Sequence, residues 1–214
     1  MFYSSVKRVF DILASLIAIV FFAVPWIIII ICLKKQSPGP AIYKARRVGL
    51  NGRIFTLYKF RTMRVDSGQI HSTTLRGDSR IFPFGAFLRK TKLDETPQLF
   101  NILQGYMSVI GPRPEDEANA NNIYVGKYKE ILSVKPGLSS PASLYDYTHG
   151  ERYESEDVYN KEFLPRKLDM ELYYVKHRSL AYDFRLIVRT IVIICEIAFG
   201  KENFSEPEEL NGIN

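Results

Sequence analysis

The stretch Ile12–Leu33, ILASLIAIVFFAVPWIIIIICL, decides how this chain is organised. It contains 22 residues without a single charge, and Ser15 supplies its only hydroxyl group. A straight helix of that length reaches about 33 Å, enough to cross the hydrocarbon core of a bilayer. The run is longer than the apolar region of a typical signal peptide, and no small-x-small cleavage site follows it. We therefore expect a helix that stays in the membrane.

Pro25 and the basic flanks decide how that helix meets the bilayer. Proline removes a backbone hydrogen bond and kinks or breaks a helix. Lys7 and Arg8 precede the run, and Lys34 and Lys35 follow it, whereas lysine and arginine collect on the cytoplasmic side. Two basic flanks favour a re-entrant helical hairpin that turns at Pro25 and returns to the same face. An ordinary kinked spanning helix fits the composition equally well.

Outward from this run the pattern becomes that of a soluble domain. The breaker Ser37–Pro40 is followed by an expected strand over Ala41–Ala45, a turn over Gly49–Gly52 and a second strand over Arg53–Phe60. Residues 65–79 and 139–160 are polar and are expected to be loops. Expected helices cover Gly85–Lys90, Thr96–Leu103, Glu115–Leu132, Phe163–Val175 and Ala181–Phe199.

Two of the expected helices carry further local signals. Thr96 is expected to cap a helix that has Pro97 in its first position and stops at Gly105. Ala181–Phe199 is apolar but carries four charged residues, which suits an amphipathic or core helix better than a second span. The predicted fold is α+β: a membrane helix or re-entrant helix hairpin with basic flanks (1–36), a small, mostly helical domain with a short β-hairpin (37–200), and a loose acidic tail (201–214).

Charge and cysteine content narrow the range of partners. The net charge is +6 and the isoelectric point is about 9.2, which suits nucleic acid, anionic lipid or a phosphorylated substrate. Cys32 and Cys195 each lie in an apolar run and are interpreted as buried free thiols. The sequence lacks the Walker A, zinc-protease and dinucleotide-binding motifs. Its three histidines are scattered along the chain and do not indicate a metal site: His71, His149 and His177.

The acidic pair Asp94-Glu95 is the candidate for chemistry. Alone, it is a favourable acidic start for the helix that follows. Several cations flank it in the sequence: Lys59, Arg61, Arg89, Lys90 and Arg113. The backbone of Arg113 is constrained between two prolines, which suits a fixed phosphate clamp. A carboxylate can bind Mg²⁺ or attack phosphorus, so the group indicates a site for a phosphorylated substrate.

An ordered set of motifs runs through nearly the whole chain, from about Lys7 to Ile194. Its members are Lys7–Asp11, Pro25, Gly39–Tyr43, Tyr58–Met63, Leu93–Glu95, Gln98–Asn101, Met107–Ser108, Gly111–Pro114 and Lys135–Leu138. In that order and spacing the chain resembles the small monotopic bacterial phosphoglycosyl transferases, also called bacterial sugar transferases. The order and spacing are far more specific than any single member.

The resemblance implies a placement and a reaction. Lys7, Arg8, Asp11 and Pro25 would belong to a re-entrant hairpin, with the catalytic domain on the cytoplasmic face of the bacterial inner membrane. Asp94 would attack the sugar-bearing phosphorus of a UDP-sugar, expel UMP and pass the phospho-sugar to a polyprenyl (undecaprenyl) phosphate. Such a product initiates surface glycan or glycoprotein assembly.

The resemblance also implies roles for the surrounding groups. Mg²⁺ would bind Asp94, and Glu95 would act as base or as orienting group. Phosphates would be held by the basic positions Lys59, Arg61, Arg89 and Arg113. The partners would be the bilayer, the lipid phosphate and the UDP-sugar, without nucleic acid; a homodimer is left open.

Three places depart from the family pattern. Val24 stands where a serine commonly precedes the kink proline, and Tyr106 stands where an acidic residue is common. Leu138–Ser143 replaces the frequent Thr-Gly-Trp-Ala-Gln run, and the Asn-Gly-Arg that often follows is missing. This last region is expected to shape the sugar or uridine pocket, so the sugar is not specified.

Other functions explain the residues less well. A non-catalytic, membrane-anchored module that binds lipid or nucleic acid accounts for the charge and the anchor, but gives no reason for an acidic pair among cations. A multipass transferase needs many apolar spans, and this chain has one clear run. The intact Asp94-Glu95 pair speaks against an inactive homologue.

Overall fold

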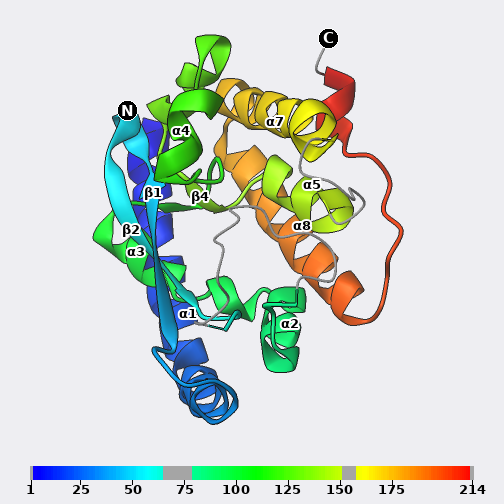
Figure 1. Ribbon diagram of the computed structural model, residues 1–214. Helices are drawn as coiled ribbons and strands as arrows, with labels where there is room; N and C mark the ends of the chain where they lie inside the picture. Colours follow the sequence, from blue (N-terminus) through cyan, green and yellow to red (C-terminus); the bar gives the residue numbers. More distant parts are fainter. Residues whose placement is uncertain (1, 65–78, 151–157, 213–214) are drawn as a thin grey trace.

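The computed structural model describes residues 2–64, 79–150 and 158–212. Its first element is the longest: α1 covers Phe2–Gln36, 35 residues, and continues through Pro25. The helix is not straight, because its first turns run behind the β-hairpin whereas its last turns are seen end on (Figure 1). Across the described residues, α1 is the one helix long and apolar enough to cross a membrane.

One face of α1 packs on the rest of the protein. Its buried residues are Asp11, Ser15, Ile29 and Leu33, spaced so that they fall on one side of a helix. Most of its other apolar side chains are exposed, among them Ile17, Val20 and Phe21 at more than 70%. A long unpaired apolar surface of this kind marks an interaction with protein or membrane.

The expected β-hairpin is present. Strand β1 (Ile42–Val48) pairs antiparallel with β2 (Ile54–Phe60), from Ile42 opposite Phe60 to Val48 opposite Ile54. The connecting turn places Asn51 at φ 55° and Gly52 at φ 75°, as the Gly49–Gly52 turn requires. The described chain resumes at α2 (Pro83–Lys90); the 65–79 loop prediction falls almost wholly outside the described residues.

Helix α3 (Gln98–Gln104) ends at Gly105, whose φ of 87° makes the expected glycine stop. Its start differs from the prediction. Thr96 does not cap the helix, because a 3₁₀ turn over Leu93–Glu95 precedes it and the Thr96 hydroxyl donates to the Leu93 carbonyl (2.7 Å). Buried Asn101 fixes α3 to β2 by accepting from Tyr58 N–H (3.1 Å) and donating to the Thr56 carbonyl (2.7 Å).

A second, parallel pair of strands was not predicted. Strand β3 (Ser108–Ile110) lies beside β4 (Gly137–Ser139). The two strands approach so closely beyond Ile110 that a Cβ on Gly137 would lie 2.1 Å from the Gly111 nitrogen. Glycine at 137 is therefore needed for backbone packing.

In the described part of the C-terminal half, four α-helices follow, and a π-helical turn over Tyr159–Phe163 leads into the third of them. They are α4 (Glu117–Ile123), α5 (Pro141–His149), α7 (Leu164–His177) and α8 (Leu180–Ala198). The long helix predicted over Glu115–Leu132 is wrong, since α4 ends at Ile123 and a 3₁₀ segment covers Gly126–Ser133. The loop predicted over 139–160 is also wrong for α5, which begins after Ser140 caps it and has Pro141 in its first turn.

The elements form two groups joined by β3 and β4 (Figure 1). Helices α1, α2 and α3 contact one another or the β-hairpin, while α5, α7 and α8 pack together on the other side. Strands β3 and β4 contact α8, and β3 also contacts α1. The acid-rich end of the chain returns to α8, where buried Glu209 accepts from Arg189 (2.9 Å) and Tyr182 (2.9 Å). Residues around Glu209 are thus docked on α8 and are not loose as predicted. Cys195 is also exposed, whereas the sequence predicted a buried thiol.

Candidate active site

The acidic pair lies in the short 3₁₀ turn between α2 and α3. Lys92, at φ 57°, turns the backbone into Leu93–Glu95, a left-handed conformation uncommon outside glycine and asparagine. Asp94 is 4% exposed and Glu95 is 8% exposed. The Oδ1 atom of Asp94 is buried without a hydrogen-bond partner. A buried acceptor in that state is an unusual feature that needs a ligand or a functional explanation.

Glu95 is held by two cations. The Arg113 guanidinium donates to both of its oxygens, at 3.2 and 3.5 Å, and Lys92 Nζ lies 3.6 Å from Oε1. Burial alone would raise the pKa of Glu95, but Arg113 and Lys92 outweigh burial and hold this pKa well below its usual range. Glu95 is therefore an ionised, engaged carboxylate.

Asp94 has the opposite character. Burial, and next the charge of Glu95, raise the pKa of Asp94 above its usual range, although Lys92, Lys59 and Arg89 oppose the shift. Two adjacent carboxylates with pKa values pushed apart indicate two different roles. Asp94 is the less stabilised anion and the one with an unengaged oxygen, which suits a nucleophile or a metal ligand.

Lys59, near the end of β2, is a half-buried cation of the site. Burial lowers the pKa of Lys59 to about 8, even though Asp94 and Glu95 raise it. Its ammonium group also lies 5.3 Å from the centre of the Tyr43 ring on β1. Lys59, Arg89, Lys92 and Arg113 thus surround the pair, and three of these four were predicted from the sequence.

Arg113 is fixed through its backbone as well as its side chain. Its N–H donates to Glu171 Oε1 on α7 (2.8 Å), and the hydroxyl of Ser140 donates to the same oxygen (2.8 Å). Burial raises the pKa of Glu171 to about 7. The flanking prolines and this carboxylate hold the Pro112–Pro114 backbone so that the guanidinium meets Glu95.

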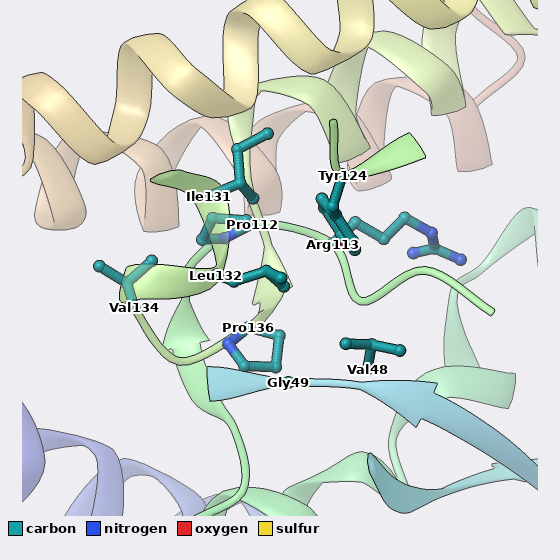
Figure 2. Close-up of a pocket in the computed structure, with 9 residues that line it drawn as sticks. All are labelled: Val48, Gly49, Pro112, Arg113, Tyr124, Ile131, Leu132, Val134 and Pro136. Carbon is teal, nitrogen blue, oxygen red and sulfur yellow. The ribbon is translucent and has the colours of Figure 1, made fainter. Parts of the chain in front are cut away.

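A hollow lies beside this segment (Figure 2). It is lined by Val48, Gly49, Pro112, Arg113, Tyr124, Ile131, Leu132, Val134 and Pro136. The Arg113 side chain points away from the other lining residues, and the acidic pair takes no part in the lining. The hollow is mostly apolar and belongs to the support of Arg113 rather than to the charged site.

Arg61 differs from the expectation of a phosphate-binding residue. It is 5% exposed, and its two terminal nitrogens donate to the main-chain carbonyls of Ser37 (2.6 Å) and Pro38. The structure thus places Arg61 as a brace for the segment that leaves α1. The charges acting most strongly on Asp94 come from Glu95, Lys92, Lys59 and Arg89 instead.

The polar residues at the start of α1 bind the protein itself. Asp11 accepts from the Ser108 hydroxyl (3.0 Å) and the Val109 N–H (2.9 Å). Arg8 donates to the Ile102 (2.6 Å) and Leu103 (2.9 Å) carbonyls at the end of α3. Lys7 pairs with buried Asp183 on α8 (2.7 Å). These residues join α1 to the domain that carries the site.

Sequence reasoning missed two residues that support the site. Lys92 gave no signal, because its proximity to Glu95 depends on a left-handed backbone. Glu171 gave a signal that was overlooked: it stands between Leu168, Leu172 and Val175 on the buried face of α7, and an acid at such a position indicates a structural or functional partner.

Asp94 is suited to a magnesium ion as a single carboxylate ligand. Its Oδ1 atom is free, and Mg²⁺ commonly takes one or two protein carboxylates together with substrate phosphates and water. Across the described residues no three His, Cys, Asp or Glu side chains converge on a metal position. Among the described residues, Asp94 is therefore the side chain of this site that could supply one ligand to a Mg²⁺ ion.

Comparison with known proteins agrees with this geometry. A family model described as bacterial sugar transferase matches residues 2–196. The chain is 39% identical to a UDP-glucose:undecaprenyl-phosphate glucose-1-phosphate transferase of Xanthomonas campestris pv. campestris, over 75% of this chain and 32% of that protein. It is 36% identical to a UDP-N-acetylgalactosamine-undecaprenyl-phosphate N-acetylgalactosaminephosphotransferase of Aeromonas hydrophila, over 88% and 43%.

A third relative is matched over nearly its whole length. The exopolysaccharide production protein PSS of Rhizobium leguminosarum bv. phaseoli is 34% identical, over 91% of this chain and 96% of that protein. The chain spans less than half of the Xanthomonas and Aeromonas relatives. Because the family model covers nearly the entire chain, this protein belongs to the bacterial sugar transferase family.

Proposed function

We propose that this protein transfers a phospho-sugar from a UDP-sugar to a polyprenyl phosphate, giving a polyprenyl diphosphate sugar and UMP. The observation that carries the proposal is the buried, unpartnered Asp94 oxygen beside Glu95 and among four cations. Two relatives are named as transferases that use undecaprenyl phosphate, which supports the class of acceptor. Different sugars appear in those names, so the donor sugar is a separate question.

The first step is an attack by an Asp94 carboxylate oxygen on the sugar-bearing phosphorus. A new O–P bond forms, the bond from that phosphorus to the oxygen of UMP breaks, and UMP leaves with the bonding electrons. Lys59, Arg89 and Arg113 stabilise the charge that develops on the phosphate oxygens. Glu95 orients Arg113 and Lys92, since its ion pairs make it a poor base.

The second step returns Asp94 to its starting state. An oxygen of the lipid phosphate attacks the same phosphorus, the bond to Asp94 breaks, and the carboxylate is regenerated. Asp94 would hold Mg²⁺, and the ion would supply positive charge that neutralises the phosphates. This chain's part in both steps is to hold one carboxylate oxygen without a hydrogen-bond partner while cations surround it.

We further propose that the protein is anchored at the cytoplasmic face of the bacterial inner membrane by a re-entrant α1. The exposed apolar surface of α1 supports an anchor, and α8 adds a second apolar face with Phe184, Val188 and Ile191 exposed. The bend of α1 and the basic residues near both ends support a return to the same side. A water-soluble nucleotide could then meet a lipid phosphate at the membrane surface.

The test is UMP release from a panel of UDP-sugars by protein in nanodiscs with Mg²⁺ and undecaprenyl phosphate. We expect Asp94→Asn and a metal chelator each to abolish release, by roughly a thousandfold or more, because no other carboxylate takes the same position. Asp169→Asn, which removes a surface partner of Lys127, should retain wild-type turnover. Wild-type turnover by Asp94→Asn would show that the nucleophile is assigned wrongly, and the absence of UMP with every donor would contradict the activity.

A further inference from the structure

The indole of Trp26 joins the membrane helix to the acidic pair. Trp26 follows Pro25 on α1, and its Nε1–H donates to Thr96 Oγ1 over 2.8 Å. Thr96 is the residue after Glu95, and its own hydroxyl donates to the carbonyl of Leu93, the residue before Asp94 (2.7 Å). A two-step hydrogen-bond path therefore runs from the helix to both ends of the catalytic turn.

The ring of Trp26 also touches the other segments that build the site. Its centre lies 6.5 Å from that of Phe60, which follows Lys59 on β2, and 5.5 Å from that of Phe100 on α3. On α1 it stacks with Phe22 at 6.5 Å, and Phe22 meets the exposed Phe21 at 5.1 Å. Aromatic contacts thus extend from the exposed face of the helix to β2, which carries Lys59, and to α3, which follows the turn that bears Asp94.

This contact is costly to lose in an apolar setting. Trp26 is flanked by an otherwise uncharged, apolar run, where an indole N–H without an acceptor is unfavourable. Thr96 supplies that acceptor, so the position of the helix near Pro25 and the position of the turn are set together. Partly buried hydrogen-bonded groups of this kind fix geometry more strongly than apolar contacts alone.

We propose that Trp26 is a positioning residue for the lipid acceptor, an inference that rests on the proposed transferase function. The nucleotide donor comes from water and is held by Lys59, Arg89 and Arg113, none of which contacts the indole through a described hydrogen bond. The phosphate of the acceptor is attached to a lipid chain in the bilayer. Whether this phosphate can contact Asp94 therefore depends on the depth of the turn relative to α1. The Trp26–Thr96 bond sets that depth.

The experiment separates the two half-reactions. Trp26→Phe removes the N–H and keeps an aromatic ring, Thr96→Val removes the hydroxyl and keeps the shape, and Thr96→Ser keeps the hydroxyl. We expect Trp26→Phe, which leaves the Thr96–Leu93 hydrogen bond in place, to release UMP without acceptor at the wild-type rate. Both Trp26→Phe and Thr96→Val should raise the KM for undecaprenyl phosphate roughly tenfold. Thr96→Ser should stay within about twofold of wild type, and the Trp26→Phe/Thr96→Val pair should be no worse than either single variant.

A spectroscopic readout is independent of turnover. Trp26 is the only tryptophan of the chain, so its fluorescence reports this site alone. We expect Thr96→Val, but not Thr96→Ser, to shift the emission maximum and to change quenching by lipids brominated at defined depths. That pattern would show that the hydroxyl sets the position of the indole in the bilayer.

Two results would overturn the inference. One is an unchanged KM for the lipid in both Trp26→Phe and Thr96→Val. The other is an equal loss of donor-only UMP release and of full turnover, which would place the effect on the acidic pair generally. If wild-type protein releases no UMP without acceptor, the covalent route is wrong, but the comparison of lipid KM with donor KM still decides the role of Trp26.

Discussion

At the scale of single residues, burial and neighbouring charges shift the pKa values of the site's carboxylates and of one lysine in different directions. Lys59 is the clearest case, because burial lowers its pKa to about 8 against the pull of Asp94 and Glu95. Below that pH the ammonium group is charged and can hold a phosphate; above it the charge is lost. The free enzyme should therefore lose affinity for a diphosphate donor as the pH rises through about 8.

This behaviour gives a prediction for the pH profile. In wild-type protein kcat/KM for the UDP-sugar should fall above pH about 8, since kcat/KM reports groups of the free enzyme. Lys59→Arg should lower the maximum several-fold, because a guanidinium does not match the position of an ammonium, but should shift the falling limb to higher pH. Lys90→Arg, at an exposed lysine, should keep the wild-type limb. If kcat/KM of Lys59→Arg falls over the same pH range as that of wild-type protein, the falling limb belongs to another group.

The sequence was informative for residues whose role follows from a motif. Asp94, Glu95, Lys59, Arg89 and Arg113 were all predicted, and the structure brings them together. Arg61 belonged to the same motif as Lys59, but it lies just beyond the end of β2 at Phe60, where its guanidinium donates to the carbonyls of Ser37 and Pro38. The motif alone did not show that β2 would end between the two cations.

At the scale of elements, the prediction succeeded where periodicity or turn residues were strong. The β-hairpin, α2, α7 and α8 were expected within a few residues, and Gly105 ended α3 as predicted. Strands β3 and β4 were missed because each has three residues, too few for an alternating pattern. Helix α5 was missed because it lies in the polar stretch 139–160, which is rich in serine, tyrosine and glutamate, while its formation depends on the Ser140 cap and on packing against α7.

The close approach of β3 and β4 gives a prediction at this scale. Gly137→Ala would place a Cβ 2.1 Å from the Gly111 nitrogen, and separating the strands should cost about 3 kcal/mol. Gly126→Ala meets nothing within 4 Å but has a φ of +54°, so strain alone should cost about 1 kcal/mol. Thermal unfolding in detergent, followed by circular dichroism, should show the larger fall for Gly137→Ala. Equal unfolding midpoints for the two variants would mean that β3 and β4 can separate to accept the added Cβ at little cost.

At the scale of the whole molecule, the sequence predicted an anchor and a catalytic domain, and the structure shows how closely the two are packed. Helix α1 is a single helix that contacts α3, α2 and β3. Its bend agrees with Pro25 as a kink. A re-entrant path through the bilayer is still a prediction, since hydrophobic length and charge are compatible with either arrangement.

Labelling from each side of the membrane tests that path. Single cysteines at Ser4 and Gln36, both exposed near the ends of α1, would be introduced after Cys32 and Cys195 are changed to serine. We expect both positions to react with an impermeant maleimide in inverted membrane vesicles and neither in right-side-out spheroplasts. Reaction of the two positions from opposite sides would show a spanning helix. Pro25→Ala, which favours a straight helix, should weaken the same-side pattern.

The junction of Lys7 with Asp183 has a consequence for how this protein can be handled. The carboxylate of Asp183 also accepts from Tyr3 (2.8 Å) and from buried Tyr174 (2.7 Å). Removing α1 would leave this acid without two of these three partners and would uncover the apolar side of α3 and β2. Helix α1 is thus a structural part of the unit that carries the acidic pair, and trimming it away to obtain a soluble form would remove part of the folded interior along with the apolar surface.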